Sequence, residues 1–162
     1  MAQRLATQIK KYRYRIMYRD DDDFDSPADP ESSAANFATW LASFSEMGYS
    51  RDKTPKYELT EVDPEVLDDG NEVKMGWDLH LESELLEAME TNLDTLEALE
   101  GDYRDILFYC EVTGHCVWFG DVLPYFNDSG VGGETGLIRM VVDKKNNATK
   151  AAARTVFEEP TS

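Results

Sequence analysis

Four residues have side chains that could carry out acid–base chemistry on an anionic ligand. Arg15 could hold an anionic group, and His80 or Glu111 could transfer protons close to Tyr109. Each occupies an outward position in an alternating stretch, so neighbouring strands would bring them onto one sheet surface. A solvated face with cross-strand ion pairs is the commoner explanation of the same pattern. This set therefore defines the alternative catalytic or ligand-binding hypothesis.

A second set consists of carboxylates alone. The segment from Glu82 to Glu100 contains no Lys or Arg, although an isolated helix gains stability from opposite charges four residues apart. Simple solubility explains such a surface about as well as selection for an Arg/Lys-rich partner. The residues that we predict to contact a basic partner are Glu84, Glu87, Glu90, Asp94 and Glu97, assisted by Asp20, Asp21, Asp22 and Asp23.

The aspartates between Asp20 and Asp25 raise the question of a metal site. A calcium loop needs a glycine at its sixth position and a bidentate glutamate at its twelfth. Counted from Asp21, these positions hold Ser26 and Ser32. The pattern does not fit, and we predict a solvated acidic loop with no metal.

Cysteine and histidine chemistry is not favoured either. Cys110, His115 and Cys116 are more widely spaced than the close pairs of structural zinc sites. Adjacent strand residues point to opposite faces, so His115 is poorly placed to activate Cys116 as a nucleophile. The glycine-rich stretch 130–136 lacks the Gly-Lys-Ser/Thr ending of a phosphate-binding loop. We expect buried thiols and no cofactor.

The overall charge limits the classes of partner. The chain has 162 residues and a formal net charge of −17 at pH 7. This charge repels nucleic acid and anionic membrane surfaces, and it favours attraction to a basic protein. No apolar run approaches the ~18 residues of a membrane helix, and the N-terminal segment lacks the apolar core of a secretory signal. The chain has only two cysteines, which suggests a reducing compartment, so we expect a cytoplasmic protein.

The elements that must position these groups are clearest between residues 73 and 112. Alternation over Val73–Leu81 predicts a strand with one buried face. Ser83 is a typical helix cap, Gly101 would end that helix, and a second strand follows over Ile106–Val112. The apolar residues at helical spacing are Leu86, Met89, Leu93 and Leu96.

Other segments extend this unit in both directions. Alternation predicts strands at residues 12–18 and 57–62, with turns at 63–71. A helix is expected from about residue 30 to Gly48. Thr113-Gly114 predicts a hairpin turn, and a late strand is expected over residues 137–142.

The order strand, helix, strand, strand, helix, strand matches the split βαβ arrangement of the ferredoxin-like fold. We therefore predict an α+β domain whose antiparallel sheet has both helices on one face, with a C-terminal hairpin and strand added. The open sheet face would carry the Arg15 set and would also allow self-association. The predicted organisation is a flexible lead-in at residues 1–11, one domain at 12–142 and a polar tail at 143–162.

These patterns favour an acidic, non-enzymatic interaction protein. It would bind and inhibit a basic protein, such as one that binds nucleic acid, by imitating the spacing of phosphates. Inhibitors of DNA-binding enzymes, phage counter-defence proteins and immunity proteins share this charge character. The alternatives are a small-molecule-binding protein or enzyme that uses the open sheet face, and a structural component that assembles with itself.

Overall fold

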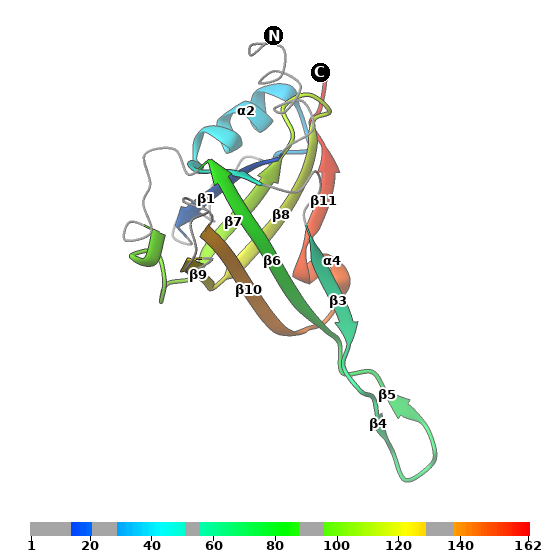
Figure 1. Cartoon of the computed structure of the whole chain (residues 1–162). Helices are drawn as coiled ribbons and strands as arrows, with labels where there is room; N and C mark the ends of the chain where they lie inside the picture. Colours follow the sequence, from blue (N-terminus) through cyan, green and yellow to red (C-terminus); the bar gives the residue numbers. More distant parts are fainter. Residues whose placement is uncertain (1–13, 21–28, 51–55, 88–95, 129–137) are drawn as a thin grey trace.

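The structure is a computed structural model that describes residues 14–20, 29–50, 56–87, 96–128 and 138–162 (Figure 1). Strands are its main elements. They are β1 (Arg15–Asp20), β2 (Ser45–Ser50), β3 (Tyr57–Glu61), β4 (Glu65–Val66), β5 (Glu72–Val73), β6 (Trp77–Glu87), β7 (Arg104–Tyr109), β8 (His115–Val122), β9 (Pro124–Asp128), β10 (Ile138–Asn147) and β11 (Thr155–Glu158). Two helices lie wholly within the described ranges, α2 (Ala34–Ala42) and α4 (Lys150–Ala153).

A nine-stranded sheet forms the body, in the order β11-β8-β7-β1-β2-β6-β10-β9 with β3 paired to β6. All of its strand pairs are antiparallel. β6 is its longest strand and has β10 along one side. The other side of β6 pairs with β3 near the start of β6 and with β2 near the end of β6. The sheet is strongly curled, so that β6 and β10 pass across β7 and β8 (Figure 1).

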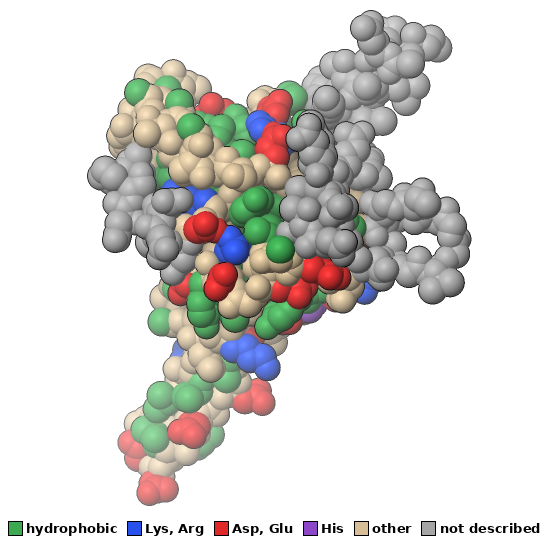
Figure 2. Space-filling view, turned by 90° about the vertical axis from the view of Figure 1, so that its left-hand side faces the viewer, with side chains coloured by type: hydrophobic (Ala, Val, Ile, Leu, Met, Phe, Trp, Pro, Cys, Tyr) green, Lys and Arg blue, Asp and Glu red, His purple; other side chains and the backbone are tan. Residues whose placement is uncertain are grey.

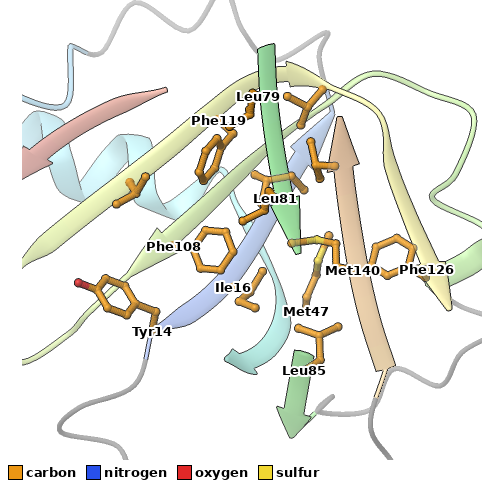
Figure 3. Packing of buried hydrophobic residues seen from close by; sticks show 14 of the residues in the cluster. Tyr14, Ile16, Met47, Leu79, Leu81, Leu85, Phe108, Phe119, Phe126 and Met140 are labelled. Carbon is orange, nitrogen blue, oxygen red and sulfur yellow. The ribbon is translucent and has the colours of Figure 1, made fainter. Parts of the chain in front are cut away.

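The main apolar core fills the concave face of this curled sheet. Leu79, Leu81 and Leu85 alternate along β6, and each is no more than 1 % exposed. They point toward Ile16 of β1 and Phe108 of β7, which come from the opposite half of the sheet (Figure 3). Burial of one such side chain contributes about 1.5–3 kcal/mol. The curl therefore lets one sheet supply both walls of its own core.

Helix α2 covers the convex face of β7 and β8. Ser33 caps its first turn, and Phe37 and Trp40, one turn apart, are its buried residues. They pack in a second apolar cluster with Leu107 of β7 and Phe157 of β11. The Trp40 and Phe157 ring centroids are 5.6 Å apart in an edge-to-face arrangement. The pattern that predicts this helix is confirmed, but the helix ends before residue 43.

The predicted ferredoxin-like α+β fold is wrong. Its second helix was expected to begin at Ser83, but β6 continues through Ser83 and Leu85 to Glu87. Ser83 is 4 % exposed and pairs with Met140 of β10. Alternation of buried and outward residues thus persists into this segment, and pairing with β10 outweighs the capping preference of one serine. Leu96 and Glu97 are helical, while residues 88–95 lie outside the described ranges.

A further strand also separates the observed sheet from the predicted one. β2 follows α2 directly and contains Gly48, the residue expected to end the helix. It lies between β1 and β6, so β1 neighbours β2 and β7 instead of β6 and β7. Residues 143–162, expected to be a polar tail, include the end of β10, helix α4 and strand β11, which pairs with β8.

A buried ion pair links β1 to β7 beneath α2. Arg19 Nε donates to Asp105 Oδ2 at 2.7 Å, and the two side chains are 2 % and 0 % exposed. The Arg19 guanidinium also donates to the Ser43 hydroxyl and lies 4.8 Å from the centroid of the Phe44 ring. Asp105 Oδ1 accepts a bond from the backbone N–H of Asp121. Both buried charges are therefore compensated.

Candidate functional site: the hairpin arm

Three of the four residues in the alternative catalytic set lie close together. Arg15 of β1 is the register partner of Tyr109 in β7, and Arg15 Nη1 lies 2.9 Å from Glu111 Oε1. Arg15 Nη2 forms a second salt bridge, with Glu46 of β2. Two carboxylates therefore already balance this guanidinium, which leaves little attraction for an anionic ligand.

The fourth member, His80, lies elsewhere on the sheet. It pairs across β6 with Glu58 of β3 and Asp143 of β10. Across the sheet, Arg15 pairs with Tyr49 of β2, and Tyr49 pairs with Glu87 of β6. Glu87 is seven residues from His80 along β6. At ~3.3 Å per residue this is roughly 23 Å along the strand. The structure therefore does not assemble the four residues into one site.

Two groups with reactive atoms, Tyr109 from this set and Cys116, are held in their protonated forms. Burial raises the pKa of the Tyr109 phenol, and so does its hydrogen bond to Glu159 Oε2 at 2.8 Å. Burial also raises the pKa of the Cys116 thiol to about 12. Cys110 lies in the concave core and Cys116 in the convex cluster, so the two thiols occupy opposite faces and form no disulfide with each other. Among the described residues, no group of three or more His, Cys, Asp or Glu could hold a metal ion.

The carboxylates predicted to contact a partner do not form a ridge on one helix. Glu84 and Glu87 belong to strand β6, because β6 continues where the helix was expected. Glu97 is helical and exposed, and Asp20 ends β1 in a salt bridge with Arg104. The remaining predicted residues, Glu90, Asp94, Asp21, Asp22 and Asp23, lie outside the described ranges.

The outward face of β6 is acidic, but neighbouring groups partly compensate it. Glu84 lies opposite Arg139 of β10. His80 Nδ1 is 2.6 Å from Asp143 Oδ1, and His80 Nε2 is 3.3 Å from Glu82 Oε1. The hydrogen bond to Asp143 raises the pKa of His80 above its ordinary value, so imidazolium is favoured beside these acids. This face is therefore a mixed-charge surface.

A hairpin arm, residues 62–76, projects from the body beyond β3 and β6 (Figure 1). β3 pairs with β6 up to Glu61 opposite Trp77, and β4 pairs with β5 from Glu65 opposite Val73. Four positions separate these pairs on each strand, so the outgoing and returning strands stay aligned. The hydrogen-bonded positions change phase, because Val62 N–H donates to the Gly76 carbonyl whereas Leu67 N–H, five residues further along, donates to the Asn71 carbonyl. β4 and β5 therefore form a separate short ladder at the end of the arm.

The two strands of the arm differ in chemistry. The outgoing strand has the acidic row, defined as Glu61, Asp63 and Glu65. The returning strand has the apolar row, defined as Val73, Met75 and Trp77. Glu61 is the register partner of Trp77, and Glu65 is the register partner of Val73. The arm therefore brings carboxylates and apolar side chains close together.

The arm carries these groups into solvent. Val73 and Met75 are 42 % and 44 % exposed, and Leu67 near the tip is 46 % exposed. Figure 2 shows acidic and hydrophobic side chains together on the projecting arm. Within the part of the chain that the structure describes, no Lys, Arg or His comes within 4.0 Å of the acidic row. The arm therefore lacks the ion pairing found on the body.

The base of the arm is held in a specific conformation. Gly76 has φ +106°, and a Cβ at this position would lie 2.3 Å from the Asn147 carbonyl oxygen. Asn147 Nδ2 donates to the Trp77 carbonyl at 3.0 Å, and Lys150 Nζ lies 4.4 Å from the centroid of the Trp77 ring. These contacts with the β10–α4 segment fix the direction in which the arm leaves the body.

Sequence reasoning missed this arm because it treated residues 63–71 as turns and began a strand at Val73. Pro64 interrupts the outgoing alternation, and prolines are typical of turns and strand edges. The signal was nevertheless present. Glu61, Asp63 and Glu65 mirror Trp77, Met75 and Val73 about the tip at Asp69, which is the symmetry of a hairpin.

Neither α2 nor α4, nor any other helix in the described ranges, has the length and apolar character needed to cross a membrane. Comparison with known proteins gave no match to a protein family, to a curated protein or to a solved structure.

Proposed function

We propose that this chain is an acidic binding protein that uses its hairpin arm to contact the basic surface of another protein. Occupying that surface would block what it normally binds, as expected of an inhibitor of the counter-defence or immunity type. The observation that carries the proposal is the arm itself, a projecting hairpin with exposed carboxylates and exposed apolar side chains side by side.

The distribution of charge supports a basic partner. Residues 57–87, which form β3 to β6 and include the arm, contain eleven Asp or Glu residues and one Lys. On the body, several charges are compensated by ion pairs such as Arg15–Glu111 and Arg19–Asp105. A concentrated, poorly compensated field attracts cationic surfaces and raises the rate of association. The same field opposes contact with nucleic acid or an anionic membrane.

The arm is also energetically unfavourable unless a partner binds to it. A two-stranded hairpin alone is marginally stable in water. Carboxylates at alternate positions of one strand lie ~6.6–6.8 Å apart and repel one another. A bound cationic surface would relieve this repulsion, and a cytoplasmic location would keep the two thiols reduced.

The test is affinity capture from the native host at low salt, followed by binding measurements with each purified captured protein. The bait is compared with an arm-neutralised variant, Glu61→Gln with Asp63→Asn and Glu65→Gln. A control variant with the same net charge changes carboxylates on the body, Glu31→Gln with Asp102→Asn and Asp121→Asn. All three control residues are exposed.

We expect a basic protein to bind the bait and the control variant, with affinity that falls steeply as salt rises. The arm-neutralised variant should bind at least tenfold more weakly. If the arm-neutralised and control variants bind their partners equally well, the arm is not the contact site and the proposal fails.

A further inference from the structure

We propose that the tip of the arm enters a cleft in the partner protein, and that both walls of this cleft supply cationic and apolar groups. The tip is defined as residues 65–73, which comprise β4, β5 and the turn between them. This inference rests on the proposed function and adds the shape and chemistry of the partner's binding surface. It starts from a property of the tip alone, which is that its two faces carry the same pair of residue types.

The strands β4 and β5 have the same sequence, Glu-Val, and pair in antiparallel register. Glu65 is the register partner of Val73, so these two side chains lie on one face. Val66 is the register partner of Glu72, and this pair lies on the opposite face, because adjacent residues of a strand point to opposite sides. Each face of the tip therefore has one carboxylate beside one apolar side chain.

Both faces of the tip are open to solvent. Val66 is 67 % exposed on one face, and Val73 is 42 % exposed on the other. Leu67 follows Val66 and extends the face of Val73, since its N–H donates to the Asn71 carbonyl and continues the ladder by one pair. A ribbon that binds a flat surface needs exposed apolar side chains on one face only. Apolar side chains on both faces fit a cleft that encloses the tip.

The turn holds the tip in one conformation. Gly70 N–H donates to the Leu67 carbonyl at 2.9 Å, and Gly70 has φ +82°, which glycine adopts without strain. Asp69 Oδ1 accepts a hydrogen bond from the Asn71 backbone N–H at 3.0 Å, and Asp69 Oδ2 accepts one from the Asn71 side-chain amide at 2.9 Å. A tip that is already ordered by its own hydrogen bonds loses little further conformational freedom on binding.

The size and charge of the tip define the cleft. Facing sheets pack about 10 Å apart, so walls that contact both faces of the ribbon would lie about 20 Å apart. Residues 65–73 contain no Lys or Arg. Their four acids are Glu65, Asp68, Asp69 and Glu72. A cleft lined with Lys or Arg complements these charges, and clefts lined by one sign of charge are surfaces that concentrate oppositely charged ligands.

The residue behind the tip limits how far it enters. Lys74 directly follows β5 and is the one Lys or Arg in residues 62–76. It would repel cationic walls, so the contact covers the strand from Asp69 to Val73, which is roughly 13 Å long at ~3.3 Å per residue. Charge disfavours a second copy of this chain as the occupant, because each chain has a net charge of −17.

The test places the photo-crosslinking amino acid benzoylphenylalanine at one position at a time in the full chain, in an extract of the native host at low salt. Val66 and Val73 sample the two faces of the tip. The matched control is Val156 of β11, which is 43 % exposed on the body. Crosslinked proteins are identified by mass spectrometry, and the protein found is then purified for binding measurements.

The binding measurements use Val66→Thr, Val73→Thr and the control Val156→Thr. Threonine keeps the β-branch that favours a strand, so each change removes apolar character without weakening the ladder. Thermal unfolding of each variant checks that the body is intact.

We expect the same protein to crosslink from Val66 and from Val73, and not from Val156. Val66→Thr and Val73→Thr should each weaken binding of that protein at least about threefold, because each removes an apolar contact with one wall, whereas Val156→Thr should change it less than about twofold. Crosslinking or loss of affinity at one face only, or a different protein at each face, would point to a flat contact and overturn the inference. Crosslinks between two copies of this chain, or equal crosslinking from Val156, would overturn it as well.

Failure of this inference is distinguishable from failure of the proposed function. If neither tip position crosslinks, but the bait still captures a basic protein that binds the arm-neutralised variant more weakly, the proposed function survives and the cleft does not. If the bait captures no basic protein, both fail.

Discussion

The Arg19–Asp105 pair offers a sharp test of how the body is held together. In Asp105→Ala, the Arg19 guanidinium stays buried without its carboxylate. Two unit charges 4 Å apart interact by about 4 kcal/mol at an effective dielectric constant of 20. Contacts of Arg19 with the Ser43 hydroxyl and the Phe44 ring remain and offset part of this loss. We therefore expect Asp105→Ala to lower the free energy of unfolding by about 3–5 kcal/mol.

Equilibrium unfolding in urea, followed by tryptophan fluorescence, measures this change. Trp40 and Trp118 lie 5.9 and 5.7 Å from the Arg19 guanidinium, so their emission reports on the site. The matched control is Asp20→Ala, which removes an exposed carboxylate from its salt bridge with Arg104. That change should cost less than about 1 kcal/mol.

A double variant separates the net contribution of the pair from the cost of leaving one charge alone. Arg19→Met with Asp105→Leu removes both charges and keeps the volume filled. It should be less destabilising than Asp105→Ala, because no unpaired charge remains. A double variant that loses as much stability as Asp105→Ala, or an Asp105→Ala loss no larger than that of Asp20→Ala, would refute this reasoning.

Three further predictions concern the arm base, a surface histidine and a buried thiol. Gly76→Ala should lower the free energy of unfolding by about 2–3 kcal/mol, because of its backbone clash and left-handed φ; Gly70→Ala, with positive φ but open space, should lose only about 1 kcal/mol in the same urea titration. The raised pKa of His80 means that its stabilising effect is fully present below pH 6.5 and is lost as the pH rises through the folded-state value. His80→Gln should therefore lower the thermal midpoint at pH 5.5 and leave it unchanged at pH 9, and equal shifts at both pH values would count against the contact with Asp143. Cys116, with its pKa raised to about 12 by burial, should resist iodoacetamide at pH 8 in the folded protein and react in guanidinium, as mass spectrometry would show.

Local pattern was enough to identify several elements. Phe37 and Trp40 at helical spacing after Ser33 predict α2, because burial and capping agree at this point. The strand around Ile106 and the hairpin turn at Thr113-Gly114 were also identified, since their alternation and turn chemistry are unambiguous.

The fold class was not predictable in the same way, because it depends on long-range pairing. Leu86 fits the helical spacing that continues to Leu96, whereas Leu85 fits the alternation that begins at Leu79. Pairing with β10 favours the strand over the helix at this point. β10 lies more than fifty residues later in the chain and pairs with β6 as far as Leu85. Gly48 was a comparable case, because a glycine that usually ends a helix lies here within β2.

The candidate site was predictable in charge but not in shape. An excess of carboxylates is visible in the sequence, yet nothing local shows that the acids from Glu61 to Glu72 leave the body on an arm. That conclusion needs the register of β3 with β6, which aligns Glu61 with Trp77 and thereby sets one row beside the other.

The separate ladder at the end of the arm has a consequence for how this protein could vary. β4 and β5 pair only with each other in the described sheets. Two residues added to each of these strands would extend the reach of the arm by ~6.6–6.8 Å. The clamp at Gly76 and Asn147 would be undisturbed. Reach can therefore change in paired steps while the body remains as it is.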